Sequence, residues 1–522
     1  MNNQYISKVV DLTDPQKNII YNMSHEEAVA IVKSGDLEAV RKIDGQFCLI
    51  SVDGKTIRMA RSIGRPIRYF IAKQAVGPQL IVAERIDVIF EHLKKEGLDD
   101  QFHPSYTRMA PAHYVTKIEL LGCPDPNPVY ERFFTPKRNF YQPDNIQQIG
   151  KDYIGAVYDE IKKWLLKRAT KGPIGVTFSA GIDSGSIFVL LYHALIELGQ
   201  SPSRLKAFTL SVEGEGEDLM QARKFLRALD MELFLEPVEL DYNALNWKEA
   251  VNVVEDYKPL DIQSATMNLS LLQSIRSKYP EWKYIIDGDG GDENLKDYPI
   301  EDNPELTIKS VLNNLMLYHE GWGVDSIKHS LTYSGGLSRG YMRTFSPADL
   351  LGFEGFSPYT LPNVIEISEG IPYIDLTDWD HQKLYDLKGQ IVAAGVKAIT
   401  GMDMPVFEKR RFQHGATSRD TFNKHFPEKE MDYRTLHQTV WPGVVDQVAR
   451  AKSRNLCIYL VELDGLLVKF LYVEYMGSDE KKDAAASLAD PINQRWWKLT
   501  DACQKPFSDV KEGIWAPLEA LK

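Results

Sequence analysis

Two short segments of this 522-residue chain carry residue types that bind phosphate and a divalent cation. The first runs from Phe178 to Ser186 with the sequence FSAGIDSGS, after the apolar stretch 174–178 and before a longer apolar stretch. Small residues let backbone N–H groups close around a phosphate, and the N-terminus of a following helix adds partial positive charge. The hydroxyl groups of Ser179 and Ser184 add donors, and the Asp183 carboxylate is a ligand that Mg²⁺ accepts. The segment therefore predicts a phosphate-binding turn between a strand and a helix.

This turn differs from the Walker-type loop that holds the β- and γ-phosphates, because no Gly-Lys-Ser/Thr follows it. Ala180 and Gly181 supply the small side chains at its centre. A methyl group at Ala180 is tolerated where φ is negative. A Gly/Ser-rich turn alone is a weak signal, and a simple tight turn stays an alternative.

The second segment is Asp287–Asn294, DGDGGDEN, which follows a short apolar stretch typical of a buried strand. Gly288 and Gly290 leave the backbone flexible enough to bring Asp292 beside Asp183, so that both carboxylates could share Mg²⁺ on a pyrophosphate. The EF-hand spacing and its terminal Glu are missing, which argues against a calcium loop. A solvated acidic turn is the remaining alternative.

The elements around these segments alternate in type. Apolar residues recur at helical spacing over 154–165, and a strand is expected at 174–178, a helix at 186–198, a strand at 206–212 and a helix at 218–229. Repeated strand–helix order predicts a doubly wound parallel α/β sheet with helical additions, whose loops gather at one edge. We include Leu210, within the second of these strands, among the nucleotide-binding positions.

Residues 1–135 show a different pattern of short β-branched and aromatic stretches separated by turn residues. Strands are expected at 47–52 and 56–60, joined by a tight turn, and at 67–72 and 79–83, with one helix at 86–95. This pattern predicts a β-rich sandwich with few helices. Proline-rich sequence around 123–137 suggests a boundary, so we expect a two-domain α/β protein with domains at 1–135 and 145–522.

Composition narrows the classes of protein. A net charge of −12 disfavours a general nucleic-acid or anionic-membrane surface. The first residues lack a signal-peptide pattern, and no stretch reaches the roughly 20 apolar residues of a membrane helix. The four cysteines are scattered, which argues against a zinc site and a disulfide framework. We expect a cytoplasmic protein without a nucleic-acid or membrane partner.

Both segments resemble parts of known synthetases. FSAGIDSGS resembles the SGGxDSS pyrophosphate loop of the ATP pyrophosphatase group, which includes asparagine, GMP and argininosuccinate synthetases and tRNA thiolation enzymes. Asp287 to Tyr298 resembles SGEGADELFGGY of asparagine synthetases without a gap. The resemblance places Asp289 where that family has a catalytic glutamate and β-lactam synthetases have a tyrosine. It implies that Asp289 is the general base for the attacking amine, and that the substrate is not the standard one.

Two downstream segments extend the resemblance. Arg343–Pro358 is similar to the R…GLEARVPF stretch and implies a catalytic role for Glu354, although a helix-end carboxylate is an equal alternative. FEKRRFQHG at 407–415 is similar to RQKEQFSDG. This implies that Lys409 contacts the phosphate and the developing charge of the transition state. Clustered cations are more often a solvated face, and the two arginines after Lys409 are assigned to the surface or the substrate.

The N-terminal part resembles the glutamine amidotransferase half of asparagine synthetases, which implies an Ntn-hydrolase-like fold. The similarity lies in Asp44–Phe47 (DGxF), in 61–69 (RDxxGxxPLYY) and in 82–84 (the FASE strand). That chemistry needs a cysteine at the mature N-terminus. Position 2 is Asn2, and the first cysteine, Cys48, falls within an expected strand. The resemblance therefore implies the scaffold without glutamine hydrolysis, a loss or remodelling shared with β-lactam synthetases and lasso-peptide cyclases.

Together these patterns predict an ATP- and Mg²⁺-dependent ligase that adenylates a small-molecule carboxylate, releases pyrophosphate and forms an amide with an amine. We favour specialised metabolism such as antibiotic biosynthesis, with a ring-forming or an intermolecular product and with a peptide among the candidate substrates. An ammonia-dependent asparagine-synthetase-like enzyme, a sulfur-transfer enzyme and an inactive binding protein are the alternatives. A homodimer is left open.

Overall fold

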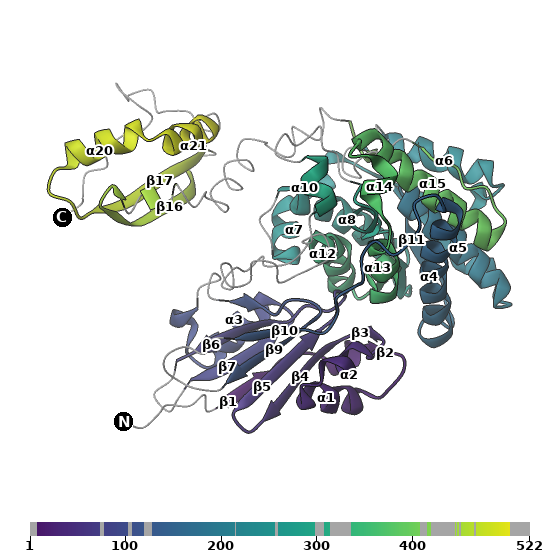
Figure 1. The fold of residues 1–522 in the computed structure, drawn as a ribbon, viewed down its shortest axis with the longest axis horizontal. Helices are drawn as coiled ribbons and strands as arrows, with labels where there is room; N and C mark the ends of the chain where they lie inside the picture. Colours follow the sequence, from purple (N-terminus) through teal and green to yellow (C-terminus); the bar gives the residue numbers. More distant parts are fainter. Residues whose placement is uncertain are drawn as a thin grey trace. The chain divides into compact units, whose positions relative to one another are not determined.

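The computed structural model describes residues 8–73, 78–102, 107–119, 128–214, 216–255, 259–297, 307–313, 336–407, 415–418, 444, 446–447, 450–463 and 466–501. Internal contacts divide the chain into two units (Figure 1). The first comprises Met1–Asp256 and Asp261–Phe422, and the second comprises Tyr257–Leu260 and Asn423–Lys522. The first unit contains both a β-sandwich and a parallel α/β sheet.

The sandwich consists of two four-stranded sheets. One has the order β1 (Lys8–Asp11), β7 (Gln79–Ala83), β6 (Arg68–Ala72), β8 (Arg108–Met109), and the other β10 (Val129–Arg132), β9 (Tyr114–Glu119), β5 (Thr56–Arg61), β4 (Cys48–Asp53). Every pairing is antiparallel except the parallel pair β1–β7. The predicted strands and their tight turn are therefore present.

Alternating side chains of both sheets fill the space between them. The buried residues of this layer come from β4, β5 and β9 on one side and from β6 and β7 on the other, and include Cys48, Met59, Tyr69, Leu80 and Ile118. Helices α1 (His25–Ser34) and α2 (Leu37–Arg41) pack on the outer face of one sheet, and α3 (Ile86–Lys95) packs on the other (Figure 1). Helix α3 has the predicted bounds.

The α/β sheet has the order β13 (Leu235–Leu240), β12 (Leu205–Val212), β11 (Ile174–Thr177), β14 (Tyr284–Ile286), β15 (Glu354–Phe356). All of its strand pairs are parallel. The strand order reverses direction between β11 and β14, and the loops after these two strands leave the same edge. In open parallel sheets such a switch point is where ligands bind. The predicted parallel sheet is confirmed.

Helices cover this sheet on both faces (Figure 1). They are α4 (Ile146–Lys167), α5 (Ile182–Glu197), α6 (Glu217–Ala228), α7 (Trp247–Val254), α8 (Pro259–Lys278), α9 (Gly291–Leu295), α10 (Ile308–Asn313), α12 (Gly336–Leu350), α13 (Pro362–Glu369), α14 (Tyr373–Thr377) and α15 (His381–Thr400). Helix α5 begins four residues before the predicted start at Ser186, immediately after Gly181. Asp183 and Ser184 therefore lie in its first turn.

Polar contacts join the sandwich to the α/β part. Lys17 Nζ lies 2.8 Å from Asp349 Oδ1 on α12, and Arg68 Nε donates to Glu255 Oε2 at 2.8 Å. The other oxygen of Glu255 accepts the backbone N–H of Ile86 at 2.7 Å, at the start of α3. One carboxylate thus binds both an arginine and a helix N-terminus of the sandwich, which fixes the orientation of the two parts of this unit.

The second unit contains the antiparallel pair β16 (Ser453–Leu463) and β17 (Leu466–Tyr475), followed by α20 (Glu480–Ala489) and α21 (Pro491–Asp501). Trp496 and Asn493 of α21 are buried. The sequence pattern predicted no boundary near residue 422, where this unit begins. Among the described helices of the whole chain, none is both long and apolar enough to cross a membrane.

Candidate active site

The turn after β11 leads directly into α5, so its hydroxyl groups lie at a helix N-terminus. Ser179 Oγ and Ser184 Oγ are 3.2 Å apart, and Ser184 Oγ accepts the backbone N–H of Ser179 at 3.3 Å. The backbone N–H of Gly181 donates to Ser179 Oγ at 3.4 Å. The first N–H groups of a helix have no partner within the helix. The turn therefore offers hydroxyl and N–H donors to one anion.

The backbone at Ala180 differs from the sequence-based expectation. Its φ is +57°, in the left-handed region, whereas we argued that a methyl group there is tolerated at negative φ. An alanine in this conformation costs about 1 kcal/mol. The Gln221 side chain donates to the carbonyl of Ala180 at 3.1 Å, and the methyl group is buried. These contacts hold the strained turn in place.

The loop after β14 packs directly against this turn. A side chain at Gly291 would place its Cβ 2.2 Å from Asp183 Oδ1, and one at Gly288 would place it 2.8 Å from the Ser184 nitrogen. Such distances are too short for real Cβ atoms, so both positions require glycine. The two segments that the sequence singled out therefore meet at the switch point of the sheet. Gly290, with φ of +100°, precedes α9 and directs the chain away again.

A buried lysine that the sequence analysis missed lies between the two predicted metal ligands. Lys388 of α15 is 2% exposed, and its ammonium group lies 2.7 Å from Asp183 Oδ2, contacts Asp292 Oδ1, and lies 3.2 Å from Asp297 Oδ2. Burial alone would lower the pKa of Lys388, but the three aspartates outweigh burial and raise its pKa. Lys388 is therefore a permanent cation at this site.

The contacts of Lys388 indicate whether Asp183 and Asp292 are placed to bind Mg²⁺. The carboxylates of Asp183 and Asp292 already converge on one cationic group. Two carboxylates together with substrate phosphates are the usual ligand set of Mg²⁺. No three His, Cys, Asp or Glu side chains form a self-sufficient metal cage in the described segments. The arrangement fits an ion that is held jointly by Asp183, Asp292 and a pyrophosphate.

Asp287 and Asp289 form a close carboxyl pair in the same loop. Asp287 Oδ1 accepts the backbone N–H of Asp289 at 3.0 Å and also binds the hydroxyl of Ser357. Burial raises the pKa of Asp287 to about 7. Burial, and then the charge of Asp287, raise the pKa of Asp289 well above its usual range. Because two neighbouring carboxylates cannot both ionise cheaply, the pair holds a proton near neutral pH.

Two further predicted site residues lie elsewhere. Glu354 pairs with Tyr284 across β14–β15, at the edge of the sheet opposite the loop that follows β14. Its carboxylate accepts from Arg168 Nε at 2.7 Å, and Lys283 Nζ lies 3.6 Å away. This geometry favours a structural role over the predicted catalytic one. Leu210 is buried within β12, and its predicted nucleotide contact stays a prediction.

Lys409, the predicted phosphate-contacting lysine, lies outside the described residues. Phe407, at the start of that motif, packs against the core of the α/β part, and Gly415 lies against Asp218. The role of Lys409 stays a prediction.

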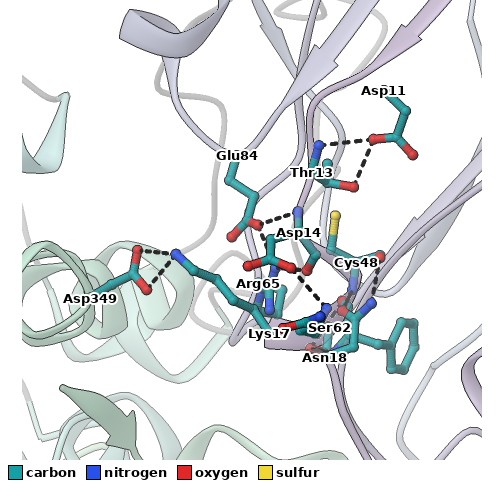
Figure 2. A network of polar contacts seen from close by, with 12 residues as sticks. Asp11, Thr13, Asp14, Lys17, Asn18, Cys48, Ser62, Arg65, Glu84 and Asp349 are labelled. Carbon is teal, nitrogen blue, oxygen red and sulfur yellow. Dashed lines mark hydrogen bonds and ion pairs between the residues drawn. The ribbon is translucent and has the colours of Figure 1, made fainter. Parts of the chain in front are cut away.

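The sandwich has no exposed nucleophile at Cys48. Figure 2 shows this residue next to Asn18, which accepts the Cys48 N–H at 2.8 Å and donates to the Cys48 carbonyl at 3.2 Å. Burial raises the pKa of the Cys48 thiol to about 12. Nearby, Arg65 forms an ion pair with Glu84, and Lys17 extends to Asp349. The Cys48 thiol is therefore protonated and enclosed, and it lacks the reactivity that glutamine hydrolysis requires.

In comparisons with known proteins, two regions of the chain match the models of different families. Residues 161–334 match the family model of asparagine synthase, and residues 422–521 match the family model of L-rhamnose mutarotase. The L-rhamnose mutarotase of Oceanobacillus iheyensis is 29% identical over 84 residues, which cover 16% of this chain and 76% of that protein. Neither family model covers half of the chain. The chain thus carries an asparagine-synthase-like region, which supports an ATP-dependent ligase, and a mutarotase-like region.

The Lys388 contacts lead to a stability prediction. Lys388→Met leaves three carboxylates around an apolar side chain, and loss of one partner of a buried ion pair costs about 3 kcal/mol. We expect the melting temperature of the full chain to fall by about 5 °C. Added Mg²⁺ should raise it more in the variant than in the wild type, because the ion replaces the missing charge.

Lys383→Met is the matched control. Lys383 lies on the same helix, and its ion pair with Asp378 is exposed, with side-chain exposures of 54% and 78%. Exposed ion pairs contribute little to the free energy of unfolding, so the melting temperature of Lys383→Met should match that of the wild type. Equal responses to Mg²⁺ in wild type and Lys388→Met would contradict a shared cation position.

The second prediction concerns Cys48. Because its thiol is buried and protonated, iodoacetamide should leave Cys48 unmodified in the native chain between pH 7 and pH 9, and should modify it after unfolding in urea. Peptide mass spectrometry distinguishes Cys48 from the other cysteines. Rapid native labelling of Cys48 would show an accessible thiolate, contrary to the structure.

Proposed function

We propose that the α/β part catalyses ATP-dependent amide formation through an acyl-adenylate, without glutamine hydrolysis. One observation carries the proposal: Asp183 and Asp292, on loops after neighbouring parallel strands, converge on one cation next to a turn suited to pyrophosphate. The asparagine-synthase match over 161–334 includes both loops and supports the same chemistry.

In the first step, a carboxylate oxygen of the substrate attacks the α-phosphorus of ATP, and pyrophosphate leaves. The turn at Ser179–Ser184 binds the departing phosphates with N–H and hydroxyl donors, and Lys388 neutralises charge beside them. Mg²⁺, held by Asp183 and Asp292, would offset charge on the pyrophosphate. Lys409 is proposed to contact the phosphorus that is attacked.

In the second step, the nitrogen of an amine attacks the carbonyl carbon of the adenylate. The new C–N bond replaces the C–O bond to AMP, which leaves with the electron pair. We assign the amine proton to Asp289. In its ionised form, a carboxylate of raised pKa is a stronger base than an ordinary one, because its conjugate acid is weaker. The Asp287–Asp289 pair must therefore lose its proton before Asp289 accepts the one from the amine.

This mechanism predicts pyrophosphate exchange into ATP that depends on a carboxylic acid. We expect exchange with at least one member of a panel of amino acids, dicarboxylates and peptide acids. Asp183→Ala should lower that exchange at least about 100-fold, because charge at the leaving pyrophosphate is no longer balanced. Asp378→Ala, at an exposed carboxylate of the same part, should exchange like the wild type.

Asp289→Asn separates the two steps. It should keep the exchange, which precedes proton removal, and lower amide formation about 100-fold. If the wild type fails to exchange with every acid of the panel although it binds ATP, adenylation is not its reaction. Equal loss of exchange and amide formation in Asp289→Asn would contradict its role as base.

A second activity is proposed for the unit that comprises Asn423–Lys522. The match to the mutarotase family model, over residues 422–521, covers nearly all of this segment. We propose that this region interconverts the anomers of a sugar. Opening the ring moves a proton from the anomeric hydroxyl group to the ring oxygen, and this needs acid–base groups that work near neutral pH. His425 and His437 are the two histidines of the matched region. The activity requires no ATP.

NMR exchange spectroscopy on L-rhamnose tests this proposal. We expect the full chain to accelerate anomer exchange. In the double variant His425→Asn/His437→Asn, the catalysed rate of exchange should fall at least about 100-fold. Asp183→Ala should keep the acceleration while losing pyrophosphate exchange, since the two activities are separate. Uncatalysed exchange rates with L-rhamnose and related aldoses in the presence of wild-type chain would refute it.

A further inference from the structure

An arginine next to the proposed base is held, among the described residues, through its Nε atom. Arg343 lies on α12, and its Nε donates to Asp261 Oδ1 at 2.7 Å. Asn268 of α8 fixes the helix at this point, because its amide donates to the Thr344 hydroxyl at 2.9 Å and to the Arg343 carbonyl at 3.4 Å. The backbone and the inner end of the guanidinium group are therefore fixed.

The outer end of this group remains available. The Arg343 side chain is 21% exposed, whereas that of Asp261 is 5% exposed. Within the described segments, Nη1 and Nη2 of Arg343 have no hydrogen-bond acceptor. A guanidinium group binds carboxylates through parallel N–H donors in a fixed plane. Arg343 thus presents two oriented donors at a position that is partly open.

Acidic groups lie beside these donors. Burial and the charge of Asp287 raise the pKa of Asp289, whereas the hydroxyl of Thr344, the next residue on α12, and the charge of Arg343 lower it. Arg343 also interacts electrostatically with Asp289 and with Glu293 of the same loop. In the part of the chain that the structure describes, Arg343, with no acceptor at its Nη atoms, is therefore placed next to two carboxyl groups, one of them the proposed base.

This pattern of charge matches a zwitterion. The carboxylate of an amino acid would pair with the guanidinium group, while its ammonium group would face Glu293 and Asp289. Ammonia or a simple amine, protonated before reaction, would meet Arg343 as a like charge and leave its donors unused. The neighbourhood therefore favours an amine that also carries a carboxylate.

We propose that Arg343 binds the carboxylate of an amino acid that is the nucleophile of the amide-forming step. This rests on the proposed amide synthesis. The ammonium group first gives one proton to Asp289, and the amino nitrogen then attacks the carbonyl carbon of the adenylate. The C–O bond to AMP breaks, AMP leaves with the electron pair, and the second proton of the nitrogen passes to the phosphate of the departing AMP. The product is an N-acyl amino acid or a peptide.

Binding to the full chain tests this directly. Calorimetry in the presence of AMP is carried out with the proteinogenic amino acids and with matched amines that lack the carboxylate, such as L-lysine with cadaverine and L-phenylalanine with 2-phenylethylamine. We expect at least one amino acid to bind at least about 30-fold more tightly than its matched amine, and Arg343→Met to remove that preference. Arg343→Lys should retain part of it.

Arg41→Met is the matched control, because Arg41 has similar exposure (29%) and also forms an ion pair with a carboxylate, 3.0 Å to Glu366. It should bind the amino acid like the wild type. AMP affinity is measured in every variant, and its loss in Arg343→Met together with amino-acid affinity would show a structural role and overturn the proposal. Equal affinity for acid and amine, or no amino-acid binding by the wild type, would overturn it too.

The exchange assay separates this proposal from the reaction itself. An amino acid that binds through Arg343 should not support pyrophosphate exchange alone. If it does, it is the adenylated substrate, and the assignment as nucleophile is wrong. If pyrophosphate exchange occurs but no amino acid binds, the Arg343 proposal is wrong and the proposed function still stands. If an amino acid binds through Arg343 but no acid supports exchange, the Arg343 site stands and the proposed adenylation is wrong.

Discussion

The ammonium group of Lys388 is the contact on which the candidate site depends. It joins three aspartates that would otherwise repel one another, with side-chain exposures from 4% at Asp297 to 41% at Asp292. Asp183 is 205 residues before it and Asp292 is 96 residues before it. One cation therefore fixes the phosphate turn, the acidic loop and helix α15 relative to one another. Without it, the same carboxylates would separate or bind protons, and the two loops would lose their common orientation.

The sheet makes this contact possible. Strands β11 and β14 are parallel neighbours, so the loops that follow them must leave the same edge. Glycines then allow the second loop to pack closely on the first, Gly288 against the backbone of Asp183 and Ser184 and Gly291 against the Asp183 side chain. Motif spacing predicted both loops and their meeting, because strand–helix alternation and glycine content are local properties of the sequence. The sandwich strands were predictable for the same reason: alternation and turn residues act over a few positions.

The remaining features depend on distant partners. Lys388 stands in an amphipathic helix, where a lysine normally marks a solvated face, and only the fold shows that it is buried. Glu354 was placed by resemblance at a catalytic position, yet the strand register puts it next to Arg168 at the opposite edge. No proline-rich linker marks the change of unit near residue 422, and the charged residues there, such as Arg419, Asp420 and Lys424, do not distinguish a linker from a solvated surface. The mutarotase-like region was not apparent from its pattern.

At the end of the acidic loop, charged residues stand where the resembled family stretch has glycines. Lys296 and Asp297 occupy the positions of the last two glycines of the resembled SGEGADELFGGY stretch. Lys296 has φ of +58°, which costs a lysine about 1 kcal/mol, and it forms a fully buried ion pair of 2.7 Å with Glu369. Asp297 lies 3.2 Å from Lys388. Removing one partner of such a buried pair costs more than the strain. The ion pairs therefore hold the loop in a conformation that glycine would otherwise have to allow, and Asp292, four residues before Lys296, is positioned by this ionic network.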